Sequence, residues 1–135
     1  MRKAILLFVI CLIAMGAGRK SIPSNLLHAL NQVEARGRHV NVPPGDGGTA
    51  IGPFQIHIEY WQDAIDFDDS IGGSYADCND YDYAVKIVTA YMERYGENFI
   101  SSGNLEALAR IHNGGPQGYR HSATKKYWVK VKSNL

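Results

Sequence analysis

Two carboxylates in the first third of the chain have types and positions that could perform acid–base chemistry. Glu34 follows an amphipathic stretch, whereas Asp46 lies in a segment rich in glycine and proline. Cleavage of a glycosidic bond needs one carboxyl group that stays protonated and a second that stays ionised. The pair therefore makes glycoside hydrolysis the first reaction to consider.

The predicted surroundings of these carboxylates differ in the way that this reaction requires. Leu27, Leu30 and Glu34 are spaced i, i+3 and i+7, so Glu34 should project beside the apolar face of a helix. Partial burial there would raise its pKa, while the glycine-rich turn should keep Asp46 hydrated and ionised. An ordinary explanation stays open for both, because a glutamate in a last helical turn is usually only solvated and Asp-Gly is a common turn.

The segment that must position the two carboxylates is predicted to be a helix followed by a small β-hairpin. Ser24 is a candidate N-cap of the helix, and Gly37 can end it in the left-handed conformation. Residues 38–42 alternate polar and apolar, residues 49–58 are apolar-rich, and a Pro-Pro-Gly turn separates them, which predicts the two strands. A short helix is expected from about Glu59 to Ile65.

Hydrophobic periodicity and chain breakers predict the remaining helices. Apolar residues recur at steps of three and four from about residue 79 to residue 95, which indicates a core helix that Gly96 would end. Another helix is expected over about 104–111, where an Asn-Gly-Gly-Pro run stops it, and a last one over about 122–132. Helices around one small hairpin give an α+β, mainly α, fold.

The N-terminal end has the layout of a secretory signal peptide. Arg2 and Lys3 precede an uncharged apolar run that small residues close. We therefore expect residues 1–18 to be a signal peptide and residues 19–135 to form one domain, secreted to the extracellular space or the periplasm. A membrane anchor is the weaker interpretation, because the run is shorter than the roughly 20 residues that span a bilayer.

Charge and cysteine content restrict the kinds of partner and site. The net charge is only +1, and we expect no nucleic-acid partner. Basic residues gather near the C-terminal end, where they could favour an anionic polymer such as a cell wall or form a solvated helix face. With Cys11 in the predicted signal peptide, Cys78 has no disulfide partner, and its acidic neighbours indicate a structural thiol. The five histidines are scattered, so no metal or other cofactor is expected.

Five blocks of the sequence carry a family resemblance. They are VEARG at 33–37, GPFQIHIEYW at 52–61, YAVKIVTAYMERY at 83–95, ARIHNGGPQGY at 109–119 and SATKKYWVKV at 122–131. In this order and at this spacing they resemble the invertebrate-type lysozyme family, also called destabilase-like. The resemblance covers nearly all of the chain after the predicted signal peptide.

The resemblance implies a lysozyme-like fold and hydrolysis of the β-1,4 bond between N-acetylmuramic acid and N-acetylglucosamine in bacterial peptidoglycan. It matches Glu34 to the general acid and Asp46 to the carboxylate that attacks or stabilises the sugar cation. It also implies a set of sugar-binding positions: Thr49, Gln55, Ile56, Tyr60, His112 and Asn113. We expect a monomer whose partner is the cell wall. Two alternatives stay open: the Tyr60 ring could instead belong to the core, and His112-Asn113 could have no role other than to end a helix.

The sequence departs from the family in two ways that affect this interpretation. The family is dense in cysteine, and its expected positions here hold Ile51, Tyr83, Ile87 and Tyr119. Burial would then have to replace cross-linking. Compared with the family, the segment between Asp46 and Gly52 is also one residue shorter, which puts the geometry of the hairpin in question. The rival hypothesis is therefore a non-catalytic peptidoglycan-binding protein on the same fold, with Asp46 displaced.

Overall fold

The computed structural model describes residues 21–135, and the predicted signal peptide lies outside them. Helices and one small antiparallel sheet make up the described part of the chain: α1 (Ser24–Ala35), β1 (Ala50–Ile51), β2 (Ile56–His57), α2 (Ile58–Phe67), α3 (Tyr81–Ser102), α4 (Leu105–Gly114) and α5 (Lys125–Lys132). Short 3₁₀ turns occupy several of the connections, including Asp46–Gly48 and Tyr75–Asn79. The α+β, mainly α, fold class is confirmed.

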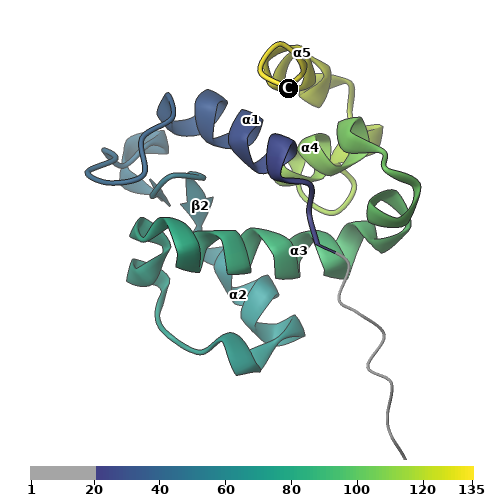
Figure 1. The fold of residues 1–135 in the computed structure, drawn as a ribbon. Coiled ribbons are helices and arrows are strands. Elements are labelled where there is room, and N and C mark those ends of the chain that lie inside the picture. The colour runs from purple at the N-terminus through teal and green to yellow at the C-terminus, as the bar shows by residue number, and fades with distance from the viewer. Residues whose placement is uncertain (1–20) are drawn as a thin grey trace, which may run out of the picture.

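Helix α3 is the central element of the fold. It crosses the middle of the molecule, with α2 on one side and α1 and α4 on the other (Figure 1). Gly96, where the sequence predicted the end of this helix, has a non-helical φ of −137° and forms a kink, and a further helical segment continues from there to Ser102. A Cβ at this position would lie 2.9 Å from Leu108 Cδ2. Glycine at this position therefore allows the close approach of α4 as well as interrupting α3.

Helix α1 ends immediately after the candidate acid Glu34. Arg36 is its C-cap with a φ of 54°, and Gly37 also has a positive φ, so the left-handed termination begins one residue earlier than predicted. At the other end Pro23 holds the N-cap position, and Ser24 is the first helical residue rather than the cap. The predicted location of Glu34 in the last helical turn is confirmed.

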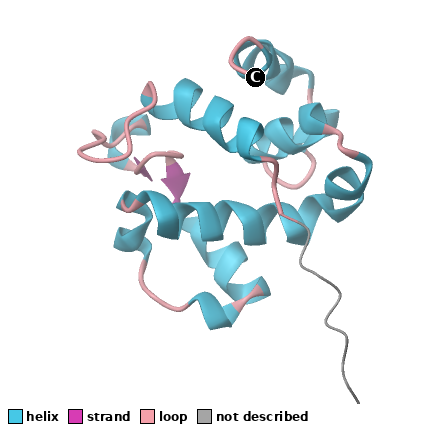
Figure 2. Cartoon of the chain, viewed as in Figure 1, coloured by secondary structure: helices cyan, strands magenta, loops and turns pink. Residues whose placement is uncertain are grey.

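The β-hairpin lies later in the chain than the sequence predicted. Ala50 pairs with His57 and Ile51 with Ile56, so both strands come from the apolar-rich run. Residues 38–42 form no strand, because Asn41 takes a φ of 54° and breaks the extended conformation. The two short strands lie at one end of the molecule beside a long loop (Figure 2). The hairpin is therefore tight, and the loop before it is free to carry Asp46.

The other predicted helices form with shifted ends. Helix α2 is longer than expected and reaches Phe67, and α4 continues through the Asn-Gly pair to Gly114. Residues 122–124 form a 3₁₀ turn that precedes α5. Within residues 21–135, no helix combines the length and the apolar character that crossing a bilayer requires.

Packing holds the fold together in place of cross-links. Fully buried side chains from α1, α3, α4 and the hairpin form the core: Leu26, Leu30, Phe54, Ile56, Ile87, Met92 and Leu108. Of the positions where the family would place cysteine, Ile87 belongs to this core, and Ile51, Tyr83 and Tyr119 pack against it. Cys78 is buried as a free thiol, and burial raises its pKa to about 12. Such a thiol is an inert core side chain.

Candidate active site

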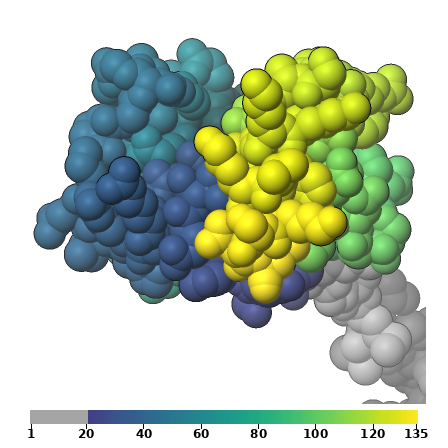
Figure 3. All heavy atoms as spheres, turned by 90° about the horizontal axis from the view of Figure 1, so that it is seen from above, coloured from purple at the N-terminus to yellow at the C-terminus, as the bar shows by residue number. Residues whose placement is uncertain are grey.

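One pocket gathers most of the residues that the sequence singled out. It has a volume of about 140 Å³ and is lined by Glu34, Asp46, Ala50, Gln55, His57, Tyr60, His112 and Asn113. These residues come from the end of α1, the hairpin with its flanking segments, and the end of α4. Seen from above, the hairpin segment and the C-terminal segments form the two sides of an indentation (Figure 3). Among the predicted site residues, only Thr49 and Ile56 do not line this pocket.

Glu34 lies in a setting that favours its protonated form. Its side chain is only 19% exposed, and burial raises its pKa from the ordinary value of 4.5 to about 7. A hydrogen bond from the Tyr127 hydroxyl opposes this shift, while the negative charge of Asp46 adds to it. A carboxyl group with this pKa can hold a proton near neutral pH and still release it, which general acid catalysis requires.

The contacts of Glu34 indicate which of its oxygens carries that proton. The Tyr127 hydroxyl donates to Oε1 of Glu34 over 2.6 Å. His112 Nε2 lies 3.7 Å from the same oxygen. Because the Tyr127 hydroxyl already donates its hydrogen to Oε1, the acidic proton belongs on Oε2. Glu34 can therefore transfer its proton from Oε2 while Tyr127 holds the other oxygen in place.

His112 takes part in this arrangement as a neutral ring. Burial lowers its pKa to about 4, against a smaller opposing effect of its hydrogen bond to the Phe54 backbone. A carbonyl oxygen can only accept, so Nε2 donates to Phe54 O over 3.2 Å, and Nδ1 accepts from the Tyr60 hydroxyl over 2.9 Å. The contact between His112 and Glu34 is therefore dipolar rather than an ion pair.

Asp46 lines the same pocket from a turn that hydrogen bonds hold in place. It begins a 3₁₀ turn with a φ of 48°, and its backbone carbonyl accepts a hydrogen bond of 2.8 Å from Thr49 Oγ1. His57 Nε2 donates to Oδ2 of Asp46 over 2.9 Å. The Asp46 side chain is 72% exposed, so Oδ1 stays open to the pocket. The Thr49 hydroxyl supports this turn, and its role as a sugar contact stays a prediction.

Gln55 connects the hairpin turn to the loop that carries Asp46. Its Nε2 donates to the backbone oxygens of Gly52, at 3.0 Å, and Pro43, at 3.4 Å. Gly45 lets the amide approach, since a Cβ there would collide with Gln55 Oε1. This contact keeps the loop against the pocket despite the missing residue. The Ile56 side chain is 1% exposed and lies in the core, so the predicted contact of Ile56 with the sugar would be made by its backbone and stays a prediction.

Tyr60 lines the pocket, and its ring and its hydroxyl both contact other residues of the protein. The ring stacks on Tyr91 with 3.6 Å between centroids and an interplanar angle of 10°, and its hydroxyl is bonded to His112. The neighbouring Trp61 is partly buried, and its Nε1 donates to the Tyr83 hydroxyl. The core interpretation of these two aromatic residues is therefore supported. Asn113 is exposed at the rim, with its side chain available to a ligand.

Sequence reasoning missed two residues of this site. Tyr127 lies 93 positions from Glu34 in the chain, so no local pattern connects them. The one indication of a role at the site was that Tyr127 belongs to the SATKKYWVKV block, but the sequence placed it only on the last predicted helix. His57 escaped notice because its partner Asp46 lies across the hairpin. In the described range 21–135, no group of three or more metal-binding side chains occurs.

Comparisons with known proteins agree with one another. A sequence model of the Destabilase family matches residues 26–134. A lysozyme of Magallana gigas is 39% identical over 112 residues, covering 82% of this chain and 79% of that protein. Invertebrate-type lysozyme 3 of Caenorhabditis elegans is 31% identical, covering 82% and 84%. Lysozyme 1 of Crassostrea virginica is 34% identical over 83% of this chain, which spans 59% of that longer protein.

The solved structures lead to the same group of proteins. The crystal structure of Tapes japonica lysozyme superposes with a TM-score of 0.69 at 32% identity, covering 82% of this chain and 88% of that one. Meretrix lusoria lysozyme in complex with Aeromonas hydrophila PliI superposes with a TM-score of 0.68 at 28% identity, covering 87% and 93%. The similarity therefore extends over sequence and fold together.

Proposed function

Because the chain belongs to the destabilase family of invertebrate-type lysozymes, we propose that it is a muramidase. It would hydrolyse the β-1,4 bond between N-acetylmuramic acid and N-acetylglucosamine in bacterial peptidoglycan. The observation that carries this proposal is the carboxylate pair: Glu34, with a pKa of about 7, lines the same small pocket as the exposed Asp46. Retention of both groups in one pocket argues against the rival hypothesis of a displaced Asp46.

In the proposed reaction the two carboxyl groups act in sequence. Glu34 gives its Oε2 proton to the glycosidic oxygen as the bond from the anomeric carbon breaks, and the leaving sugar departs as an alcohol. Asp46 attacks the anomeric carbon, or stabilises its positive charge, through Oδ1, because Oδ2 is held by His57. Water then attacks the anomeric carbon and gives a proton to Glu34, and where Asp46 has formed a bond to that carbon the bond breaks and releases the Asp46 carboxylate. Direct attack by Asp46 predicts retention of the anomeric configuration.

The remaining pocket residues would bind and orient the sugar. Asn113 offers an exposed amide at the rim, and Gln55 lies along the wall. His112 and Tyr60 would act mainly by holding Glu34 and excluding water around it. The predicted signal peptide favours a secreted protein. We propose in addition that this protein is bacteriolytic and antimicrobial and that it acts as a monomer.

The direct test is clearing of a purified peptidoglycan suspension. Glu34→Gln keeps the shape of the side chain but removes the transferable proton, so we expect the turnover rate to fall by at least about 10²-fold. Asp46→Asn should also be severe. Glu97→Gln, which changes an exposed acid on α3, is the matched control and should retain full activity.

The possible results separate the hypotheses. Clearing by the wild type but not by Glu34→Gln supports the assignment, and full activity in Glu34→Gln refutes it. Binding to peptidoglycan in a sedimentation assay without any clearing would identify a non-catalytic binding protein. Analysis of the first product by NMR would report whether the anomeric configuration is retained, as attack by Asp46 requires.

A further inference from the structure

A second pocket adjoins the catalytic pocket at Glu34. Its volume is about 290 Å³, and its lining consists of Glu34, Ala35, Arg36, Arg38, Val42 and Pro43. We call it the arginine pocket. Glu34 is the residue that it shares with the catalytic pocket. A substrate bound at the proposed general acid would therefore have a neighbouring part of its structure beside the two arginines.

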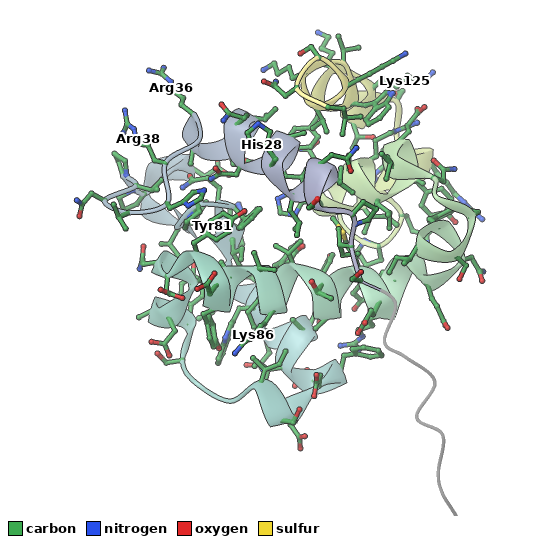
Figure 4. The ribbon with its side chains drawn as sticks, in the orientation of Figure 1. His28, Arg36, Arg38, Tyr81, Lys86 and Lys125 are labelled. Carbon is green, nitrogen blue, oxygen red and sulfur yellow. The ribbon has the colours of Figure 1, made fainter. Side chains whose placement is uncertain are left out.

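The guanidinium groups of the arginine pocket are available to a ligand. Neither the Arg36 nor the Arg38 side chain forms a hydrogen bond or an ion pair with another residue in the range 21–135. Arg36 is the C-cap of α1 and Arg38 lies in the loop that follows, and both side chains extend toward solvent (Figure 4). The only acidic residue in the lining is Glu34, which burial keeps largely protonated below pH 7. The pocket thus carries positive charge that its own lining does not neutralise.

Two further observations distinguish this pocket from a chance group of surface arginines. Arg36 occupies a left-handed position with a φ of 54°. Glycine or asparagine is more favourable in this conformation, so an arginine here carries a conformational cost. Lys130, on α5, is close enough for its positive charge to lower the pKa of Glu34. Positive charge therefore reaches the surroundings of the general acid from two elements that are distant in sequence.

We propose that the arginine pocket binds the carboxylate groups of the peptide stems on muramic acid, and that it makes the enzyme prefer stem-bearing glycan. This inference rests on the proposed muramidase function. The stems are attached to muramic acid, one of the two sugars at the cleaved bond, and they carry free carboxylates. A guanidinium group binds a carboxylate through two parallel hydrogen bonds. Val42 and Pro43 would contact the alkyl groups of the stem, whereas an uncharged glycan offers the arginines no partner.

The test compares two forms of one soluble substrate. Peptidoglycan fragments with intact stems are used directly, or after their carboxylates have been converted to methylamides. In the double variant Arg36→Gln/Arg38→Gln, we expect kcat/KM to fall about 3- to 10-fold on the charged fragments at low ionic strength. The value on the amidated fragments should stay unchanged.

A matched control removes the same amount of charge elsewhere. Lys86→Gln/Arg120→Gln also lowers the net charge by two, and Lys86 lies on the opposite side of α3 from the arginine pocket (Figure 4). This control should retain the wild-type preference. A second measurement uses Glu34→Gln as the background, with or without the arginine substitutions, and determines the Kd of each fragment by calorimetry. The arginine substitutions should weaken binding of the charged fragments alone.

The outcomes separate this inference from the muramidase proposal. An equal loss on both fragments, or no loss on either, overturns the inference while leaving the hydrolase intact. A lower Tm without a change in preference would also overturn it, and would mean that the arginines only offset the dipole of α1. If the wild type cleaves neither fragment, the muramidase proposal fails, but the Kd comparison still decides whether the pocket binds carboxylates.

Discussion

The hydroxyl group of Tyr127 offers the sharpest test of how the site sets the acidity of Glu34. It donates a 2.6 Å hydrogen bond to Glu34 Oε1 and thereby lowers the pKa of Glu34 against the larger effect of burial. The substitution Tyr127→Phe removes this bond but keeps the ring. The charged form of Glu34 then loses more stabilisation than the protonated form, so the pKa of Glu34 should rise above its present value of about 7.

The size of the shift follows from the two protonation states. A hydrogen bond to a charged acceptor contributes about 1.5–3 kcal/mol and a neutral one about 0.5–1.5 kcal/mol, so the difference is roughly 1 kcal/mol. One pKa unit corresponds to about 1.36 kcal/mol. Water that enters the vacated position would recover part of this difference. We therefore expect the pKa of Glu34 to rise by about 0.5–1 unit.

The assay is the pH dependence of kcat/KM, whose alkaline limb reports the acid of the free enzyme. In Tyr127→Phe this limb should move to higher pH, so the variant keeps relatively more activity at pH 8 than the wild type does. Tyr119→Phe is the control, because Tyr119 packs against Phe99 away from the pocket. A limb that stays in place, or that moves to lower pH, would refute the assigned role of Tyr127. A general loss of stability would lower activity without moving the limb.

Two other predictions concern stability. Glu34→Gln should raise the free energy of unfolding at pH 8 by about 1–3 kcal/mol and change it little at pH 4. The reason is that the pKa of Glu34 is higher in the folded than in the unfolded chain, so wild-type stability falls as pH rises from about 4.5 to 7. Denaturant unfolding at both pH values checks this prediction. Cys78→Ser should change the free energy of unfolding by no more than about 1–2 kcal/mol. Because Cys78 is a free thiol, dithiothreitol should leave the Tm of the wild type unchanged, and a large decrease would contradict the assignment.

Local patterns in the sequence predicted the elements of this fold well. The helix before Glu34, the central helix and the apolar stripe that raises the pKa of Glu34 all follow from spacing within one or two turns, which is the range over which periodicity acts. Gly96 shows where such reasoning stops. A glycine in a helical pattern predicts an interruption of the helix, but only the position of Leu108 in a later helix shows that Gly96 also allows a close contact.

The two carboxylates of the site could be predicted from the sequence, but the side chains that hydrogen-bond to them could not. Glu34 and Asp46 belong to one continuous segment, so their types and positions were readable. Thr49 and Ile56 do not line the pocket, and sequence does not show whether a side chain near a strand faces the pocket, the turn or the core. His57 and Tyr127 act on Asp46 and Glu34 through contacts that only the folded chain creates.

The contact between Tyr127 and Glu34 makes the C-terminal helix part of the catalytic arrangement. Helix α5 has only eight residues, and no disulfide can hold it, because Cys78 is the only cysteine within residues 21–135 and its thiol is free. Its attachment depends on packing, with Val131 fully buried and Tyr127 and Trp128 lying against the core. If α5 detached, water would reach Glu34 and its pKa would return toward 4.5. The protein would then lose its neutral-pH acid while most of the fold remained, so the docking of α5 controls the chemistry at Glu34 as well as stability.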